Sequence, residues 1–128
     1  MNLENFKKVR DLIQDLPARN FNMNTYGTVD LEKDGSHCGT VMCIAGHTCT
    51  LIDDTEIVPD GRGVLSFYKD GKNRYPWDLA RKFLGLTVIE SNHIFYGRWA
   101  SGHDLYAITK EETIEYLDKV IASGNVYG

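Results

Sequence analysis

The sequence predicts a single α+β domain, built on one buried helix that the other elements surround. The chain has 128 residues, 42% of them hydrophobic and 11% aromatic, as expected for one folded globular domain. Its longest stretch without a formal charge runs from Gly35 to Ile52, and β-rich runs separated by turns follow it. We therefore expect, within a single domain over 1–128, a central buried helix over about 40–52 packed by three to four other helices. A small antiparallel hairpin or three-stranded sheet should occupy about 56–75.

The central helix is predicted from apolar residues that recur with the helical period. Thr40 suits the N-cap position, and Asp53 and Asp54 mark the end because negative charge is unfavourable at a helix C-terminus. Cys43 and His47 lie four residues apart and so share a face, roughly opposite the apolar stripe. The stripe consists of Val41, Ile44, Ala45, Thr48 and Ile52.

The other helices are predicted from spacing and from terminal residues. A first helix over about 2–16 carries apolar residues at helical spacing and ends before Pro17. A short helix over about 77–84 is followed by Gly85, which suits a helix C-terminus. The form T-x-x-E occurs at Thr87 and again at Thr109, and predicts two further helices, to about 95 and about 122.

The predicted sheet follows the central helix. The runs 56–58 and 64–68 are rich in β-forming residues and flank the turn Pro59-Asp60-Gly61. Asp70-Gly71 gives a second turn before a short third strand within 72–75. A further extended segment is expected over about 21–26, where Phe and Met alternate with polar residues.

Charge and composition exclude several classes of function. The net charge is −4 and the pI near 5.5, whereas general nucleic-acid binding needs a basic surface. Arg74, Arg81 and Lys82 could form a local basic patch, or simply a solvated helix face. The uncharged stretch is too polar to span a membrane. The first residues carry no apolar signal region, and three cysteines are an odd number, so we expect a cytoplasmic protein with reduced thiols.

The motif Cys38-Gly39-Thr40-x-x-Cys43-Ile44-Ala45-Gly46 resembles the signature of a family of small proteins of unknown function from tailed phages, prophages and bacteria. Segments 21–23, 80–86 and 109–112 fit that pattern as well. The position of His47 is commonly aromatic in the family, often Trp, so this chain departs from the pattern there. The resemblance implies a viral or mobile-element origin, a location in the host cytoplasm, and a role in adjusting host physiology or defence. It supplies no catalytic assignment.

Two kinds of chemistry are open to the cysteines and histidines. His37, Cys38, Cys43 and His47 are zinc-ligand types, although their spacing lacks the paired knuckles of structural zinc motifs and buried thiols also serve as core residues. No other cofactor is indicated. Alternatively, Cys38 before the expected helix start would have a lowered thiol pKa, with His93 or His103 as general base.

A third possibility is a binding surface. Aromatic residues and Arg gather around the segment after residue 95, in the composition typical of interaction hot spots, or else they pin that loop onto the core. The residues are Tyr96, Arg98, Trp99, His103 and Tyr106. We expect a protein that acts by binding, with a host or defence protein as partner and a small molecule as the next possibility. A thiol-dependent enzyme using Cys38 and a zinc-stabilised adaptor are the alternatives.

Overall fold

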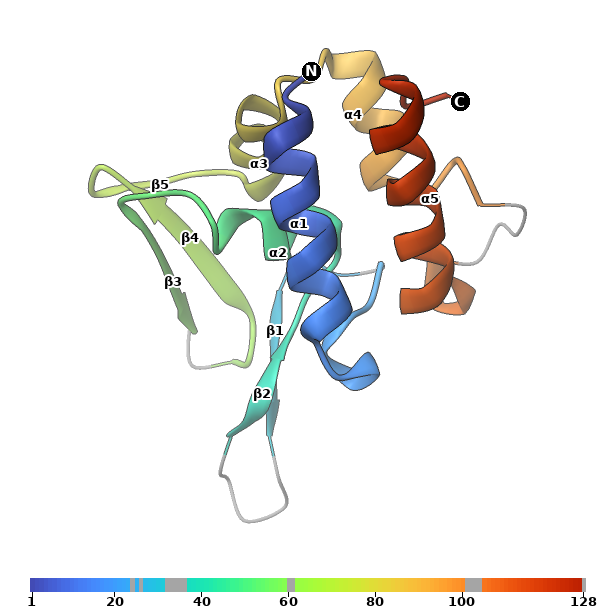
Figure 1. The fold of residues 1–128 in the computed structure, drawn as a ribbon. Helices are drawn as coiled ribbons and strands as arrows, with labels where there is room; N and C mark the ends of the chain where they lie inside the picture. Colours follow the sequence, from blue (N-terminus) through green and yellow to red (C-terminus); the bar gives the residue numbers. More distant parts are fainter. Residues whose placement is uncertain (24, 26, 32–36, 60–61, 101–104, 128) are drawn as a thin grey trace.

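The computed structural model describes residues 1–23, 25, 27–31, 37–59, 62–100 and 105–127, and for 28–31, 37–41 and 106 the backbone alone. Its fold is α+β, as predicted (Figure 1). The helices are α1 (Leu3–Asp15), α2 (Ile44–Cys49), α3 (Pro76–Leu84), α4 (Val88–Phe95) and α5 (Lys110–Ser123), with 3-10 turns η1 (Ala18–Asn20) and η2 (Leu105–Ala107). The strands are β1 (Thr28–Leu31), β2 (His37–Val41), β3 (Thr55–Pro59), β4 (Leu65–Lys69) and β5 (Lys72–Asn73). No helix in the described ranges is long and apolar enough to cross a membrane.

The predicted helix ends are confirmed at the residues that carry their signals. α1 ends at Asp15, before Pro17 as predicted, and at its start Asn2 forms a cap that was not predicted, accepting a hydrogen bond from the backbone N–H of Asn5. Gly85 ends α3 with φ 66°, a left-handed conformation that suits glycine. Thr87 forms a complete capping box with Glu90, which starts α4. The Thr109 hydroxyl caps α5 by accepting a hydrogen bond from the backbone N–H of Glu112. Local side-chain chemistry therefore fixes where these helices begin and end.

The predicted sheet is also confirmed, although Pro59, which was predicted to lie in the turn, belongs to β3, and the rest of that turn, residues 60 and 61, lies outside the described residues. β3 and β4 pair antiparallel, with Thr55 opposite Lys69 and Pro59 opposite Leu65. β5 adds to the far end of β4 through the turn at Asp70, whose φ is 56°. Side chains from this sheet, α2, α3 and the segment between β2 and α2 make a small second core, formed by Met42, Cys49, Leu65, Phe67 and Leu79.

The predicted start of the central helix at Thr40 is wrong. Residues 37–41 form β2, which pairs antiparallel with β1 so that Thr28 lies opposite Val41. The backbone N–H groups of Met42 and Cys43 donate to the carbonyls of Asn20 and Thr25, at 3.1 and 2.8 Å. Because partners remote in sequence satisfy this backbone, it has no need of helical hydrogen bonds. The helix begins only at Ile44, with Cys43 at its N-cap position.

The expected extended segment over about 21–26 is reduced to one bridge among the described residues. Phe21 pairs with Met42 in a parallel arrangement, and the N–H of Asn22 donates to the Met42 carbonyl at 3.1 Å. This contact draws the chain after η1 against the segment that leads into α2.

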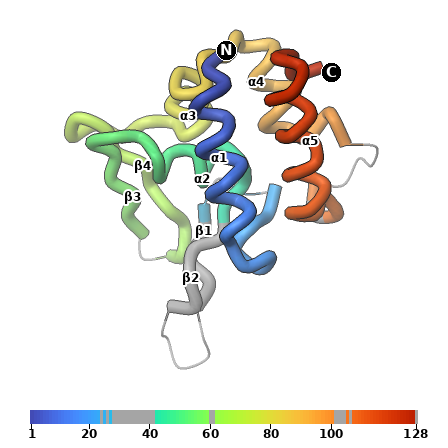
Figure 2. The backbone as a smooth tube through the Cα atoms, viewed as in Figure 1, coloured from blue at the N-terminus to red at the C-terminus, as the bar shows by residue number. Residues whose placement is uncertain are grey.

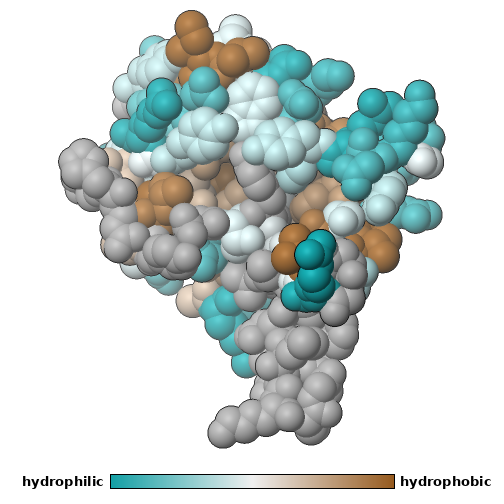
Figure 3. Space-filling model, turned by 180° about the vertical axis from the view of Figure 1, so that it is seen from behind, coloured by the Kyte–Doolittle hydropathy of each residue, from teal (hydrophilic) through white to brown (hydrophobic). Residues whose placement is uncertain are grey.

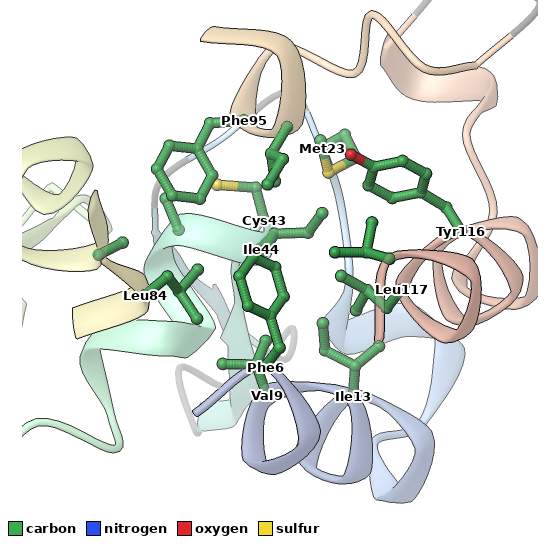
Figure 4. Close-up of a cluster of buried hydrophobic side chains, with 14 of the residues drawn as sticks. Phe6, Val9, Ile13, Met23, Cys43, Ile44, Leu84, Phe95, Tyr116 and Leu117 are labelled. Carbon is green, nitrogen blue, oxygen red and sulfur yellow. The ribbon is translucent and has the colours of Figure 1, made fainter. Parts of the chain in front are cut away.

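Although short, α2 is the buried centre of the molecule. All of its residues are buried, and Figure 4 shows Ile44 between side chains of α1 and α5. Phe6, Val9 and Ile13 of α1 and Leu117 of α5 are each completely buried in this main core. The central position predicted for this helix is therefore confirmed, with a shorter span.

The outer helices α1 and α5 lie side by side and antiparallel (Figure 2). The Arg10 guanidinium bonds Asp118 through Nε at 2.8 Å. Near the other end of the pair, Lys110 Nζ donates to the carbonyls of Gln14 and Leu16, at 2.8 and 2.7 Å. Since α1 has no basic residue in its last turn, Lys110 supplies the positive charge that a helix C-terminus favours.

Candidate functional site

Cys43 and His47, the centre of the predicted chemistry, belong to the core. Each side chain is 2% exposed. His47 Nε2 lies 2.8 Å from the carbonyl oxygen of Asn20, to which it donates, and the ring stacks on Phe21 with the planes 11° apart. Burial lowers the pKa of His47 more than the nearby carbonyls of Asn20 and Met42 raise it. The side chain is therefore a neutral, hydrogen-bonded part of the core.

The two described thiols have environments that suppress reactivity. Burial raises the pKa of Cys43 to about 11, although backbone N–H groups of Gly46 and Ala45 partly oppose the shift. Burial also raises the pKa of Cys49 to about 12, and its Sγ lies 3.6 Å from the carbonyl oxygen of Pro76. Because the thiolate is the reactive species, both cysteines act as small core residues.

The predicted zinc ligands are divided between described and undescribed side chains. His37 and Cys38 lie on β2, where only the backbone is described. Among the described side chains, no group of three or more His, Cys, Asp or Glu could hold a metal ion. For His47 to bind a metal through Nε2, it would have to give up its hydrogen bond to Asn20.

The predicted thiol site depended on a helix that starts just after Cys38, and the structure has a strand there. Cys38 lies within strand β2, so no helix dipole acts directly after it. His93 lies on α4, and Figure 1 shows α4 and the β1–β2 hairpin at opposite ends of the molecule. His103, the other candidate base, lies outside the described residues. The structure thus does not bring Cys38 and His93 together.

A cleft of about 500 Å³ lies between α4 and α5, and the chain segments that follow each helix complete it. It is lined by His93, Arg98, Trp99, Ala100, Glu112, Glu115, Tyr116, Lys119, Val126 and Tyr127. We call this the α4–α5 cleft. Its floor is aromatic: Trp99 stacks on Tyr116 with ring centroids 4.4 Å apart, and His93 contacts Tyr127 at 4.8 Å.

Hydrogen bonds hold this floor in place. The Trp99 indole N–H donates to the Ile94 carbonyl at 3.0 Å, which ties the loop after α4 to its last turn. The Tyr116 hydroxyl donates to the Val126 carbonyl at 2.7 Å, so the C-terminal segment is fixed against α5. Burial raises the pKa of Tyr116 far above its ordinary value, and the hydroxyl therefore remains a donor. The aromatic floor is accordingly preformed.

The rim of the cleft carries both signs of charge. Arg98 and Lys119 are exposed, as are Glu112 and Glu115. Lys119 pairs with Glu115 across one helical turn at 3.5 Å, a surface ion pair of small energetic value. Burial and the nearby Arg98 charge lower the pKa of His93, so this ring is neutral at pH 7.

Part of the predicted binding surface is found in this cleft. Arg98 and Trp99 line it, together with His93. Tyr96 lies outside the lining, 42% exposed, with the Arg98 guanidinium 5.8 Å from its ring centre. The side chain of Tyr106 and all of His103 lie outside what the structure describes.

Sequence reasoning missed the residues that α5 and the C-terminal segment contribute. Glu112, Glu115, Tyr116 and Lys119 are spaced three, one and three residues apart, which places them on one helical face. That spacing could have predicted a shared surface. No sequence pattern predicts a role for Tyr127, 56% exposed, because it follows the last helix and contacts His93 only in the folded chain.

Comparison with known proteins gives no family, no curated protein and no solved structure that matches this chain.

Proposed function

We propose that this protein acts by binding, and that the α4–α5 cleft is the surface that receives its partner. The observation that carries the proposal is the rigid aromatic floor with Arg98 exposed at its edge. Ordered aromatic rings beside an arginine are the residues that dominate binding energy at protein interfaces, and they lose little conformational entropy on binding.

The proposed partner is a protein of the bacterial host or of its defence system. A polypeptide can present apolar groups to the floor and charges of both signs to the rim, whose exposed residues include two cations and two carboxylates. A small molecule is the second possibility. The choice of a host or defence protein rests on the resemblance of the Cys38–Gly46 motif to phage-type proteins.

The lining favours binding over nucleophilic catalysis. None of the described lining residues is Ser, Thr or Cys, the side chains that most often form covalent intermediates. His93 is neutral and has aromatic neighbours on two sides, Tyr116 and Tyr127. This histidine therefore contributes a flat surface to the cleft.

The experiment is affinity capture from bacterial lysate with quantitative mass spectrometry. Arg98→Ala and Tyr127→Ala should each reduce recovery of the same partner at least tenfold, because both side chains are exposed at the cleft. Arg19→Ala is the matched control, since Arg19 is exposed on η1 and does not line the cleft. Trp99→Ala is unsuitable here because that ring also packs on the core. Equal recovery by all variants with unchanged thermal stability would contradict the proposed site.

A further inference from the structure

A second pocket, independent of the α4–α5 cleft, lies between α3 and the β4–β5 hairpin. Its volume is about 590 Å³. It is lined by Ile52, Lys69, Asp70, Arg74, Tyr75, Asp78, Leu79, Arg81, Lys82 and Phe83. We call it the basic pocket. Figure 3 shows hydrophilic side chains gathered at the end of the β4–β5 hairpin, the upper right of that view.

Positive charge is concentrated here against the trend of the whole chain. Four cationic side chains and two carboxylates line the basic pocket, a net charge of +2 in a protein whose net charge is −4. The cations come from β4, from the residue after β5 and from α3, so they converge from three parts of the fold. A solvated helix face would account only for Arg81 and Lys82.

Two of the four cationic side chains donate hydrogen bonds to backbone carbonyls, and the other two are available to a ligand. Lys69 Nζ donates to the Asp53 carbonyl at 2.8 Å, and Arg81 donates to the Leu86 carbonyl at 3.4 Å. Within the described part of the chain, the exposed side chains of Arg74 and Lys82 have no hydrogen-bond or ion-pair partner. Asp78, one helical turn before Lys82, is not within ion-pair distance of it either.

The wall between these charges is apolar and partly aromatic. Leu79 is buried, Ile52 and Phe83 are half-buried, and Tyr75 is 51% exposed. A ligand that fills this space can place a ring or other apolar part against this wall and an anionic group at the cations. An arginine fork with a nearby lysine suits the several oxygens of a phosphate better than it suits a single carboxylate.

We propose that the basic pocket binds a small organic phosphate of mononucleotide size, with the phosphate at Arg74 and Lys82 and the ring against Tyr75 and Phe83. Asp70 and Asp78 supply acceptors for hydroxyl groups of the ligand. The same carboxylates and the acidic chain repel a polymer with many phosphates, so a small molecule is favoured over a nucleic acid.

Titration of the full chain with adenosine 5′-monophosphate, followed by amide NMR, tests this proposal at near-physiological salt. We expect shifts in residues 69–83, and affinity at least tenfold higher than for adenosine or inorganic phosphate alone. The double variant Arg74→Ala, Lys82→Ala should reduce affinity at least tenfold. The control pair Lys8→Ala, Arg19→Ala removes the same charge from exposed positions outside the pocket and should leave affinity unchanged.

Three outcomes would overturn the proposal. One is the absence of shifts in 69–83 at millimolar nucleotide. Another is equal loss of affinity in both double variants, which would indicate general attraction of anions. The third is tighter binding by a short oligonucleotide than by the mononucleotide, which would assign the pocket to nucleic acid.

Discussion

The indole ring of Trp99 lies flat on the phenol ring of Tyr116, with centroids 4.4 Å apart and planes 4° from parallel. This stack joins the loop after α4 to the middle of α5, and both rings hydrogen-bond to backbone carbonyls. The two rings therefore have two structural roles. They fix the loop on the core, and they form the floor of the proposed binding site.

Replacing Trp99 with Ala should reduce the free energy of unfolding by about 2–4 kcal/mol, because a half-buried ring, its stacking and its hydrogen bond to Ile94 are lost together. Urea denaturation measures this change. Arg98→Ala is the control and should change stability by less than about 0.5 kcal/mol, since its side chain is exposed. Similar losses in both variants would contradict the structural role of the stack.

Gly97→Ala should be more destabilising than Gly124→Ala. Both glycines have left-handed φ values, +65° and +68°, so an added Cβ costs about 1 kcal/mol at either position. At Gly97 that Cβ would also lie 2.6 Å from Ile108 Cδ1 and 3.0 Å from Leu105 Cδ2, whereas nothing lies within 4 Å at Gly124. We expect a further loss of about 1 kcal/mol at Gly97. Equal midpoints in urea would show that the loop after α4 does not pack this tightly.

Acid should destabilise the protein partly through His47. Burial lowers its pKa in the folded state, while unfolding returns the pKa to about 6.5. Between the two pKa values the unfolded chain therefore binds more protons than the folded one. The contribution of neutral His47 to the free energy of unfolding is complete above about pH 6.5 and is lost as the pH falls from there towards the folded pKa. His47→Gln keeps a donor for the Asn20 carbonyl and removes the titration. The stability difference between the two proteins should therefore change with pH, and parallel curves would refute the assignment.

The thiols of Cys43 and Cys49 should react with iodoacetamide at least about a hundredfold more slowly in the folded protein than in urea. Both side chains are buried, and burial raises both pKa values, to about 11 and about 12. Mass spectrometry of tryptic peptides resolves each site. Rapid native labelling of Cys43 would contradict its place in the core. Rapid labelling confined to Cys38 would instead favour the thiol-enzyme alternative.

The helices that could be predicted correctly are those whose ends are set by local chemistry. Each of these ends is set by a residue within one helical turn of it, so the sequence alone is enough to locate it. The residues are Thr87 with Glu90, Thr109, Gly85 and Pro17. The pairing of β3 with β4 is also local, because β3 ends at Pro59 and β4 begins at Leu65, close by in the sequence.

The region around Thr40 could not be predicted in this way, because its partners are distant. Val41, Ile44 and Thr48 have helical spacing in the sequence, but Val41 lies in β2, and remote carbonyls of Asn20 and Thr25 accept hydrogen bonds from the backbone just before α2. A helix as short as α2 that is buried all round also has no polar face to reveal its period. The Cys and His residues were predicted as a zinc or thiol site because burial cannot be deduced from residue type alone.

The candidate site was partly predictable. The composition of the segment after α4 predicted Arg98 and Trp99, and the helical spacing of Glu112, Tyr116 and Lys119 indicates a shared face of α5. The contact between Tyr127 and His93 depends on where the C-terminal segment is fixed by the Tyr116 hydroxyl. Only the fold supplies that relationship.

Photo-crosslinking in the bacterial host tests the proposed binding site most directly. A benzophenone amino acid in place of Tyr127, 56% exposed at the α4–α5 cleft, is compared with the same substitution at Val58, which is 43% exposed on β3 and lines neither pocket. We expect one dominant protein adduct from position 127, lost when Arg98→Ala is added, and no such adduct from position 58. The same adduct from both positions, or an adduct from position 58 alone, would contradict the proposed site.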